Sequence, residues 1–288
     1  MRLRERARAK INLVLRVRGR RADGFHELES LVAFAGACDY LGFEPAEDWS
    51  LDVTGSEAPS ISGPDNLVLG AARAMVRRWP ALQPGRFTLD KHLPVASGIG
   101  GGSADAAAAI RILARTSGIA PDDPGLLEVA GEIGSDVPVC VESRSRVFRG
   151  RGEVLEPVLD LPPIACVLVN PRIAVATADV FSALGLAPGE PRSGAATGDL
   201  LPGRTATAVI GWLAEQGNDL EEPALDICPV IGDVLHRLRA VPGCRLARMS
   251  GSGATAFGLF DSRHEAAAAA RLLARENPGW WVHPTIVR

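Results

Sequence analysis

The first 17 residues of the chain alternate between apolar and polar side chains. Apolar residues fall mainly at odd positions from Leu3 to Val17, and charged or polar residues take most of the even positions. A period of two indicates a β-strand, in which alternate side chains share one face. We therefore predict a strand over residues 3–17 and expect Lys10 and Asn12 to point to the same side, as candidates for one site.

The rest of the chain mixes strand-like runs with helical periodicity. Asp65 and Asn66 offer an N-cap for a helix that reaches Trp79. Further helices are predicted at residues 106–115, 177–184, 205–216 and 227–239 and from residue 264 onward. Further strands are predicted at residues 26–34, 40–43, 50–53, 86–91, 164–169, 244–249, 254–260 and 281–287. Together these elements place the chain in the α/β (α+β) class.

A domain boundary is expected near the middle of the chain. The 288 residues suffice for two hydrophobic cores, because single cores stop growing at roughly 250 to 300 residues. The segment from residue 155 to residue 163 contains three prolines and is followed by a new apolar run. We predict one domain over residues 1–157 and a second over residues 158–288.

Charge and cysteine content narrow the possible partners and the compartment. The net charge is −3, a balance that does not indicate a nucleic acid or an anionic membrane as partner. No apolar run approaches the roughly 18 residues that span a bilayer. The five cysteines form no C-x-x-C pair, which favours free thiols in a reducing, cytoplasmic setting. A monomer and a homodimer both remain open.

The strongest local signal is Ser97-Gly-Ile-Gly-Gly-Gly-Ser103, which lies between a predicted strand and a predicted helix. Glycines let backbone N–H groups approach an anion without a Cβ in the way, and a helix N-terminus adds unpaired donors. The segment lacks the Gly-Lys-Ser/Thr of a Walker A motif and the glycine spacing of a dinucleotide-binding fingerprint. It predicts a phosphate-binding loop of another kind, with a flexible loop or a tight helix entry as the alternative.

Two other segments are weaker on their own. Ser250-Gly-Ser-Gly253 lies between two predicted strands, where a plain glycine turn is an equally good interpretation. Gly134-Ser-Asp-Val-Pro138 presents one acid, Asp136, ahead of apolar neighbours. An acid in that position is more often a helix cap or a turn residue than a catalytic base.

These segments gain weight because they occur together and in a characteristic order. The full set is Ala9-Lys-Ile-Asn-Leu13, Gly19-Arg-Arg-Ala-Asp-Gly-Phe-His-Glu-Leu28, the glycine loop with its flanks over residues 93–107, Gly134-Ser-Asp-Val-Pro138, Arg149-Gly-Arg-Gly-Glu153, Asn218-Asp-Leu220 and Ser250-Gly-Ser-Gly253. In this order the chain resembles the GHMP kinase superfamily over nearly its whole length. The first two segments are similar to the branch that acts on a cytidine diphosphate ester of methylerythritol.

The resemblance implies a two-domain fold and an ATP-dependent phosphorylation. The N-terminal domain would be like the second domain of ribosomal protein S5, and the C-terminal domain would be ferredoxin-like. The reaction would move the γ-phosphate of ATP, supplied with Mg²⁺, to the 2-hydroxyl of the cytidyl methylerythritol substrate, a step of non-mevalonate isoprenoid synthesis. No nucleic acid or membrane would take part.

Residue roles follow from the same resemblance. Lys10 and Asp136 match the catalytic pair: the carboxylate accepts the proton of the hydroxyl and the ammonium offsets charge on the γ-phosphate. The implied ATP-binding residues are Pro94, Ala96, Ser97, Gly98, Gly100, Gly101, Gly102 and Ser103. The implied substrate-binding residues are Asn12, Phe25, His26, Thr177 and Phe181.

Some points stay open at this stage. Phe25 stands where the family usually has tyrosine, and Ala104 stands where it usually has a second serine. Ser103 offers a hydroxyl to a metal or a phosphate, but no matching acidic ligand is evident, so the metal ligands are left unassigned. The alternatives are another GHMP kinase, such as a homoserine or mevalonate-type enzyme, and a catalytically silent nucleotide-binding protein on the same fold. The presence of both Lys10 and Asp136 argues against the silent protein.

Overall fold

A computed structural model describes residues 3–60, 66–192 and 205–288. The chain divides into two compact units that are both discontinuous in sequence. The first unit comprises residues 1–10, 37–95 and 100–143, and the second comprises residues 11–36, 96–99 and 144–288. This division differs from the linear boundary predicted between residues 157 and 158, because the long strands β1 (Leu3–Arg20) and β2 (His26–Pro45) each contribute residues to both units.

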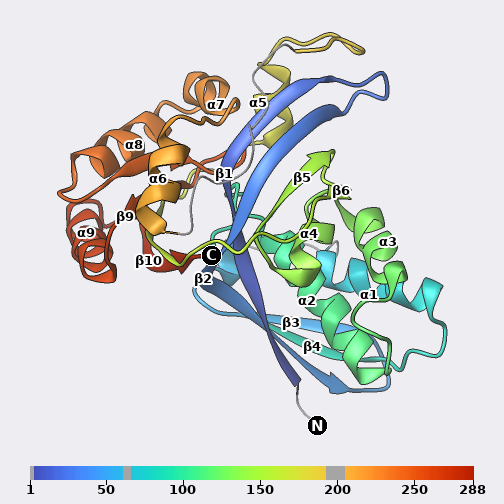
Figure 1. Cartoon of the computed structure of the whole chain (residues 1–288). Helices are drawn as coiled ribbons and strands as arrows, with labels where there is room; N and C mark the ends of the chain where they lie inside the picture. The colour runs from blue at the N-terminus through green and yellow to red at the C-terminus, as the bar shows by residue number, and fades with distance from the viewer. Residues whose placement is uncertain (1–2, 61–65, 193–204) are drawn as a thin grey trace. The chain divides into compact units, whose positions relative to one another are not determined.

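The first unit combines a mixed sheet with four helices (Figure 1). Strand β4 pairs antiparallel with the C-terminal part of β2 and parallel with β3. Helix α1 packs against α2 and α3, and α4 packs against the same two helices. The elements of this unit that follow β2 are β3 (Ser50–Thr54), η1 (Ala58–Ser60), α1 (Leu67–Arg78), β4 (Gly85–Asp90), α2 (Gly101–Thr116), α3 (Pro124–Ile133) and α4 (Val137–Glu142).

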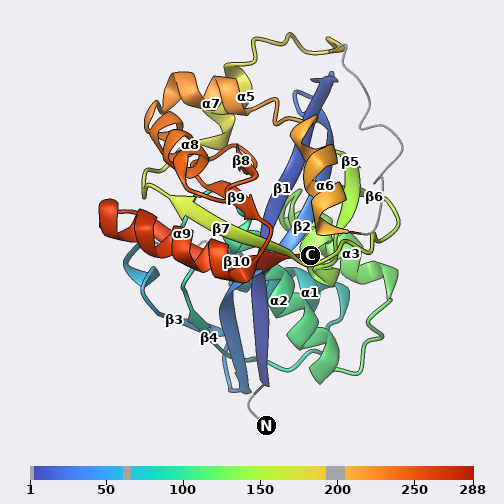
Figure 2. The same ribbon diagram turned by 60° about the vertical axis from the view of Figure 1, so that its left-hand side comes forward.

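The second unit is built on an antiparallel sheet in the order β10-β7-β9-β8. Helix α9 packs against β7, β9 and β10, and α8 packs against β8 and β9 (Figure 2). Along the chain the elements follow one another as β7, α8, β8, β9, α9 and β10. This is the ferredoxin-like β-α-β-β-α-β arrangement that the resemblance implied. The bounds of these strands and helices are β7 (Ile164–Asn170), α8 (Val230–Ala240), β8 (Leu246–Met249), β9 (Ala256–Phe260), α9 (Arg263–Glu276) and β10 (Trp281–Val287).

Further elements complete the second unit. Strand β5 pairs antiparallel with β2, and the short β6 pairs with β5. The terminal residue of β10, Val287, pairs with Ala35 of β2. The remaining elements are β5 (Arg146–Gly150), β6 (Val154–Leu155), α5 (Thr177–Ser182), α6 (Ala206–Ala214) and α7 (Glu221–Ile227).

The predicted elements are largely confirmed, with instructive differences. Asn66 caps α1 by accepting a hydrogen bond from the N–H of Val68, whereas Asp65 lies outside the described residues. The two strands predicted at residues 26–34 and 40–43 are one continuous strand, β2. Helices α3, α4 and α7 were not predicted, because two of them are six or seven residues long and local periodicity is weak over so few residues.

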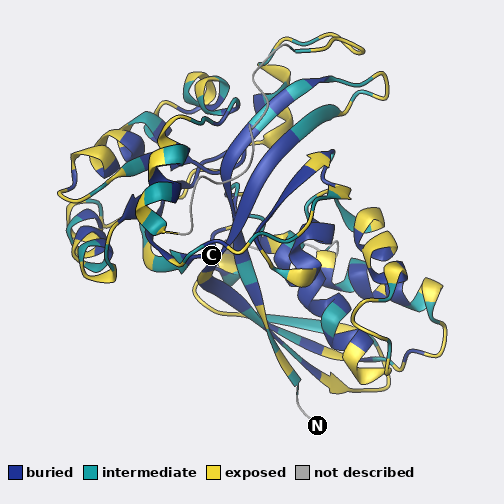
Figure 3. Ribbon diagram, viewed as in Figure 1, coloured by how far each residue is buried: buried dark blue, intermediate teal, exposed yellow. Residues whose placement is uncertain are grey.

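The predicted alternation of β1 holds at its ends but not in its middle. Every residue from Ala9 to Leu15 is buried, so both faces of the strand are covered there, as the dark blue central stretch of β1 in Figure 3 shows. Two polar side chains, Lys10 and Asn12, are therefore buried on an otherwise apolar stretch. Buried polar groups need hydrogen-bond partners, which indicates that both residues take part in specific contacts.

All five cysteines are unpaired, as predicted, and four of them are buried. Burial raises the pKa of the Cys140 thiol to about 12, with Asp136 adding to the effect. A thiol with so high a pKa is a poor nucleophile at neutral pH. Among the described residues, no helix has both the length and the apolar character needed to cross a membrane.

A buried cluster of three charged side chains lies in the first unit. The ammonium of Lys91 donates to Oδ2 of Asp39 and to Oδ2 of Asp105, both at 2.6 Å. We call these three residues the Lys91 triad. Burial, reinforced by the Asp39 carboxylate and opposed by the Lys91 ammonium, raises the pKa of Asp105 to about 7. Two carboxylates thus share one ammonium, and the Asp105 carboxyl binds a proton more readily than an ordinary aspartate does.

The raised pKa of Asp105 predicts a pH-dependent stability. In the unfolded chain this carboxyl would lose its proton near pH 4, so between about pH 4 and pH 7 the folded protein binds more protons and its stability falls as the pH rises. Three groups in the described part of the chain face Asp105. Lys91 is already charged, the Cys140 thiol stays neutral in this range, and Asp39 accepts hydrogen bonds from backbone donors.

The Asp105→Asn substitution should remove the pH dependence of stability that Asp105 causes. The melting temperature of the variant relative to the native protein should therefore rise by about 2–4 °C or more between pH 5 and pH 8. Asp122→Asn, at an exposed position in the same unit, is the control and should show no such trend. Parallel melting curves for Asp105→Asn and the native protein at every pH would contradict the assignment.

Candidate active site

Lys10 and Asp136 form an ion pair in the first unit. The Nζ of Lys10 donates to Oδ1 of Asp136 at 2.9 Å, although the two residues are 126 positions apart in sequence. The Lys10 side chain is only 4% exposed, whereas that of Asp136 is 40% exposed. The ammonium is therefore held inside the protein, and the carboxylate is accessible to a ligand. The catalytic pair predicted from the resemblance is close enough to act as a unit.

The local structure around Asp136 directs its carboxylate to Lys10. The residue lies in the short link between α3 and α4 and occupies the N-cap position of α4, as one interpretation of the sequence had it. An N-cap carboxylate commonly accepts a hydrogen bond from the helix backbone. Here the side chain makes no cap hydrogen bond and binds Lys10 instead. The carboxylate is thus aligned by the ammonium and its backbone by the buried helix that follows.

The glycine loop ends in a helix that begins earlier than predicted. Helix α2 starts at Gly101 rather than near residue 106, so Gly101, Gly102 and Ser103 form its first turn. The N–H groups of a first turn have no acceptor within the helix and are available to a phosphate. The intrahelical bond from Ala104 N to Gly100 O, at 2.8 Å, marks where the pairing begins.

The last glycine before the helix lies next to Lys10. Gly100 has a φ of 63°, and a Cβ at this position would lie 3.2 Å from Cε of Lys10. Both the left-handed backbone and the close contact favour glycine. The first unit therefore brings together three predicted residues: the N-cap glycine of α2, the ammonium of Lys10 and the carboxylate of Asp136.

The middle of the glycine loop belongs to the second unit and contacts the other glycine-rich segment. Gly98 has a φ of 74°, and a Cβ there would lie 2.5 Å from the carbonyl oxygen of Ser250 and 2.7 Å from that of Gly253. The Ser250 hydroxyl donates to Gly98 O at 3.1 Å, and Thr255 N donates to Ser97 O at 3.1 Å. Ser250-Gly-Ser-Gly253 is therefore a support for the loop and more than a plain turn.

The predicted residue Asn12 also contacts this turn. Its backbone N–H donates to the Ser250 hydroxyl at 3.1 Å, and its side-chain amide donates to the Ser30 hydroxyl at 2.8 Å. The hydroxyl of Ser30 donates in turn to Val14 O at 2.6 Å. Asn12 thus joins β1, β2 and the Ser250–Gly253 turn by a chain of buried hydrogen bonds.

The buried side chain of Asn218 braces the same turn, and the buried Arg248, two residues before it, joins three other segments. Asn218 donates to Met249 O at 3.0 Å and to Gly251 O at 2.8 Å. The guanidinium of Arg248 donates to the carbonyl oxygens of Leu13, Leu213 and Gln216 at 2.7–2.8 Å. Burial lowers the pKa of Arg248 to about 10, which leaves it charged at neutral pH. Neither residue was predicted as part of the site, although Asn218 lies in a segment that carried the resemblance.

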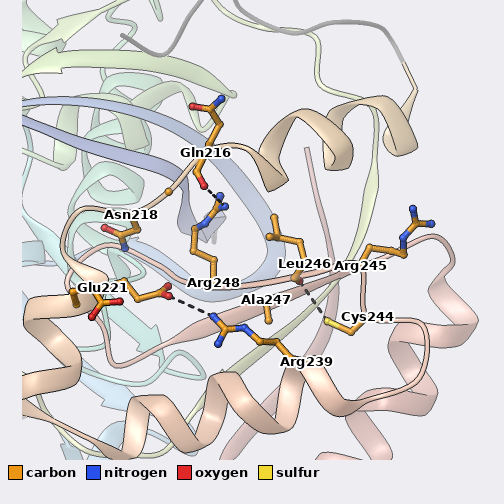
Figure 4. A pocket seen from close by; sticks show the side chains of 11 residues that line it. Gln216, Asn218, Glu221, Arg239, Cys244, Arg245, Leu246, Ala247 and Arg248 are labelled. Atoms are coloured by element: carbon orange, nitrogen blue, oxygen red, sulfur yellow. Dashed lines mark hydrogen bonds and ion pairs between the residues drawn. The ribbon is translucent and has the colours of Figure 1, made fainter. Parts of the chain in front are cut away.

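A pocket of about 440 Å³ lies beside these residues in the second unit (Figure 4). Two of its charged lining residues, Glu221 and Arg239, form an ion pair at 3.6 Å. Glu221 also accepts a hydrogen bond from Met249 N at 2.8 Å. None of the predicted site residues lines this pocket, so we assign it no ligand.

The predicted substrate-binding residues are only partly assembled. The rings of His26 and Phe181 lie 4.7 Å apart at 31°, and the hydroxyls of Thr177 and Ser252 lie 2.9 Å apart. Thr177 and Phe181 are four residues apart on α5, a spacing that places them on one helical face. Phe25 is not part of this stack: it is 50% exposed, and its ring lies 4.6 Å from the guanidinium of Arg151.

His26 has the properties of a neutral hydrogen-bonding group. Burial, with a smaller effect from the positive charge of Arg20, lowers its pKa. Its Nε2 is buried and has no hydrogen-bond partner within the described part of the chain. A buried polar atom without a partner is costly, and a ligand that supplied the partner would recover that cost.

The described residues contain no group of three or more His, Cys, Asp or Glu side chains that could form a metal centre. Mg²⁺ in kinases is usually held by one or two carboxylates together with the phosphates of the nucleotide. The residues available for such a site are Asp136, which has an exposed carboxylate, and Ser103 in the first turn of α2.

Comparisons with known proteins all point to one family. The model of the GHMP kinases N-terminal domain matches residues 66–144, and that of the GHMP kinases C-terminal domain matches residues 207–278. A 4-diphosphocytidyl-2-C-methyl-D-erythritol kinase of Xanthobacter autotrophicus is 54% identical over 291 aligned residues, which cover 99% of both chains. The chain belongs to the GHMP kinase family. Membership implies ATP as the phosphoryl donor.

Solved structures of GHMP kinases superpose on this chain with different degrees of sequence identity. The crystal structure of a 4-(cytidine 5'-diphospho)-2C-methyl-D-erythritol kinase superposes on this GHMP kinase with a TM-score of 0.76 at 33% identity and covers 99% of both chains. The homoserine kinase of Cytophaga hutchinsonii superposes with a TM-score of 0.67 at 16% identity, with 98% of this chain and 94% of that chain covered. The second likeness shows the shared fold alone.

The contact between Gly98 and the Ser250–Gly253 turn can be tested by comparing two glycine substitutions. Gly98→Ala and Gly185→Ala both place a Cβ on a left-handed backbone, at φ 74° and 69°, which costs about 1–2 kcal/mol each. Only Gly98→Ala adds a clash, since a Cβ at Gly185 meets nothing within 4 Å. Denaturant unfolding should show a loss of stability at least about 1–3 kcal/mol larger for Gly98→Ala. Equal losses would mean that the turn does not constrain the loop.

Proposed function

We propose that this GHMP kinase phosphorylates the 2-hydroxyl of 4-diphosphocytidyl-2-C-methyl-D-erythritol with ATP and Mg²⁺, as a step of isoprenoid precursor synthesis. The 2.9 Å contact between Lys10 and Asp136 is the observation that carries the chemical part of the proposal. The choice of substrate is supported by the Xanthobacter autotrophicus relative, which is named as a kinase of this compound and is 54% identical over 99% of both chains.

Asp136 and Lys10 would divide the chemistry between them. A tertiary hydroxyl is a weak nucleophile, and an accessible carboxylate that accepts its proton assists the attack on the γ-phosphate. The transferred phosphoryl group carries negative charge on its oxygens, which an ammonium stabilises without moving. The low exposure of Lys10 supports this role, because charges interact more strongly away from water.

The glycine loop would hold the phosphates of ATP. Ala96, Ser97 and the glycines of the loop would place backbone N–H donors around them, with Pro94, which has no N–H, at the start of the site. The first turn of α2 adds three N–H groups and a favourable helix dipole. Bound Mg²⁺ would supply charge neutralisation on the β- and γ-phosphates. The Ser103 hydroxyl is our candidate contact for the metal or a phosphate oxygen.

Base recognition would depend on the second unit. We propose that Phe181 stacks on the cytosine and that Nε2 of His26, which is buried without a partner in the described structure, bonds the polar edge of the base. A neutral imidazole presents one donor and one acceptor, so it can match a base edge. Asn12 and Thr177 would act near the substrate through the Ser250–Gly253 turn, and Phe25 would border the site from its exposed position.

The substrate assignment is tested by ADP release with a panel of alcohols. We expect turnover with the cytidyl methylerythritol substrate and little with homoserine or mevalonate. Asp136→Asn keeps an oxygen for Lys10 and should preserve the fold, but it should lower kcat by roughly a hundredfold or more, the usual contribution of a positioned base.

The exposed acid Asp122 serves as the matched control for that substitution. Asp122→Asn should leave kcat unchanged, because our proposal gives Asp122 no part in the reaction. An unchanged kcat for Asp136→Asn would remove it from the mechanism. Activity on homoserine or mevalonate, without activity on the cytidyl compound, would refute the substrate assignment.

The stacking role predicts a selective effect of Phe181→Ala. Loss of base stacking costs roughly 1–3 kcal/mol, and the base is remote from the reacting phosphate. The KM for the cytidyl substrate should therefore rise about tenfold or more with little change in kcat or in the KM for ATP. Leu184→Ala is the control, since Leu184 is also partly buried against the same core. If both variants melt earlier and neither changes the KM for the cytidyl substrate, Phe181 is a packing residue only.

A further inference from the structure

The backbone that leads into the glycine loop is held by a buried carboxylate of a different strand. Oδ1 of Asp39, on β2, accepts hydrogen bonds from His92 N at 2.5 Å and from Leu93 N at 2.8 Å. These are the last residues before Pro94, the first of the predicted ATP-binding residues. The same strand end is held by backbone bonds, with Lys91 N donating to Thr54 O at 2.7 Å. The upstream end of the loop is therefore fixed in the first unit.

The same cluster reaches the downstream end of the loop. Lys91 donates at 2.6 Å to Asp105, which lies on α2 one turn after its start at Gly101. A Cβ on Gly101 would lie 3.2 Å from the Nζ of Lys91 and 3.9 Å from Oδ2 of Asp39. The absence of a side chain at Gly101 thus lets the first turn of α2 pack directly on the charged cluster.

We propose that the Lys91 triad is a positioning device for nucleotide binding: it joins the two ends of the glycine loop at one point and so fixes the direction of the first N–H groups of α2. The inference rests on the proposed binding of ATP phosphates at this loop. Lys91, Asp39 and Asp105 are 2%, 0% and 3% exposed, so they act on the nucleotide through the backbone and not by touching it.

The composition of the triad favours positioning over simple stabilisation. Buried ion pairs are seldom more stable than apolar residues of the same volume, and here two carboxylates face one ammonium. In addition, Oδ1 of Asp105 is buried and has no hydrogen-bond partner among the described residues. Short, directional hydrogen bonds fix a distance and an orientation, which apolar packing does less strictly. The cluster therefore accepts an energetic cost where a defined geometry is needed.

Three single substitutions separate positioning from general stability. Asp105→Ala cuts the connection to α2 but leaves Lys91 paired with Asp39. Asp105→Asn retains an acceptor for Lys91 and is the conservative variant. Glu5→Ala is the control, because Glu5 is the acid that connects β1 to Arg111 and Arg115, further along the same helix.

We expect Asp105→Ala to raise the KM for ATP roughly tenfold, because a small misplacement of positioning groups is sufficient for such a loss. The KM for the cytidyl substrate should stay within about twofold. Asp105→Asn should restore a near-native KM for ATP, and Glu5→Ala should not change it. A KM for ATP that is unchanged in Asp105→Ala, or raised equally in Glu5→Ala, would overturn the proposal.

Hydrogen exchange provides a readout that does not depend on activity. In the nucleotide-free protein, the amide of Ala104, which bonds Gly100 O at 2.8 Å, should exchange several-fold faster in Asp105→Ala than in the native chain or Glu5→Ala. Equal rates would overturn the positioning role. If the native protein releases no ADP with any alcohol, the proposed function fails, and the exchange experiment still decides whether the triad orders the helix start.

A second variant covers the case in which Asp105→Ala does not fold. Gly101→Ala keeps all three charges and places a Cβ against the Lys91 ammonium. It should weaken binding of a non-hydrolysable ATP analogue, measured by calorimetry, and should speed exchange at Ala104. Native binding together with native exchange in Gly101→Ala would overturn the proposal.

Discussion

The structure depends on close backbone approaches that leave little or no room for a Cβ. Gly98 lies against the carbonyl oxygens of Ser250 and Gly253, Gly100 lies against the aliphatic chain of Lys10, and Gly101 lies against the ammonium of Lys91. Each contact brings main chain close to a group that must be accurately placed. A loop of glycines is flexible when isolated, and these contacts remove that freedom. The glycine loop is therefore ordered by its neighbours and not by its own sequence.

The charged side chains of the two units differ in how deeply they are buried, and the difference matches the roles that we propose for them. Lys10 is buried but its partner Asp136 is exposed, an arrangement that suits a carboxylate that must meet a substrate. The Lys91 triad is buried throughout, which suits groups that hold backbone and meet no ligand. Arg248 is also buried, and its charge is met by three carbonyl oxygens. Burial thus separates residues that can react from residues that support.

Sequence patterns located most elements and failed where tertiary contacts overrule local preference. The helix after the glycine loop was placed near residue 106, because glycines are poor helix formers. It begins at Gly101, where the first turn packs closely on the Lys91 triad and a Cβ would lie 3.2 Å from the Nζ of Lys91. Likewise, Ser250-Gly-Ser-Gly253 could not be told from an ordinary turn, because the residues it supports, Gly98 and Asn12, are far away in sequence.

The sequence by itself determined the family, most of the strands and helices and the identity of the candidate residues, because periodicity and short motifs are local properties of the chain. Only the tertiary structure decided which of these residues meet. Lys10 and Asp136 are paired across 126 positions, and His26 faces Phe181 whereas Phe25 lies beside Arg151. Asp39 lies in none of the motifs and Asp105 only in the flank of the glycine loop, and their contact with Lys91 is visible only in the structure. The physical reason is that contacts between distant segments depend on how the strands and helices pack, which local patterns do not encode.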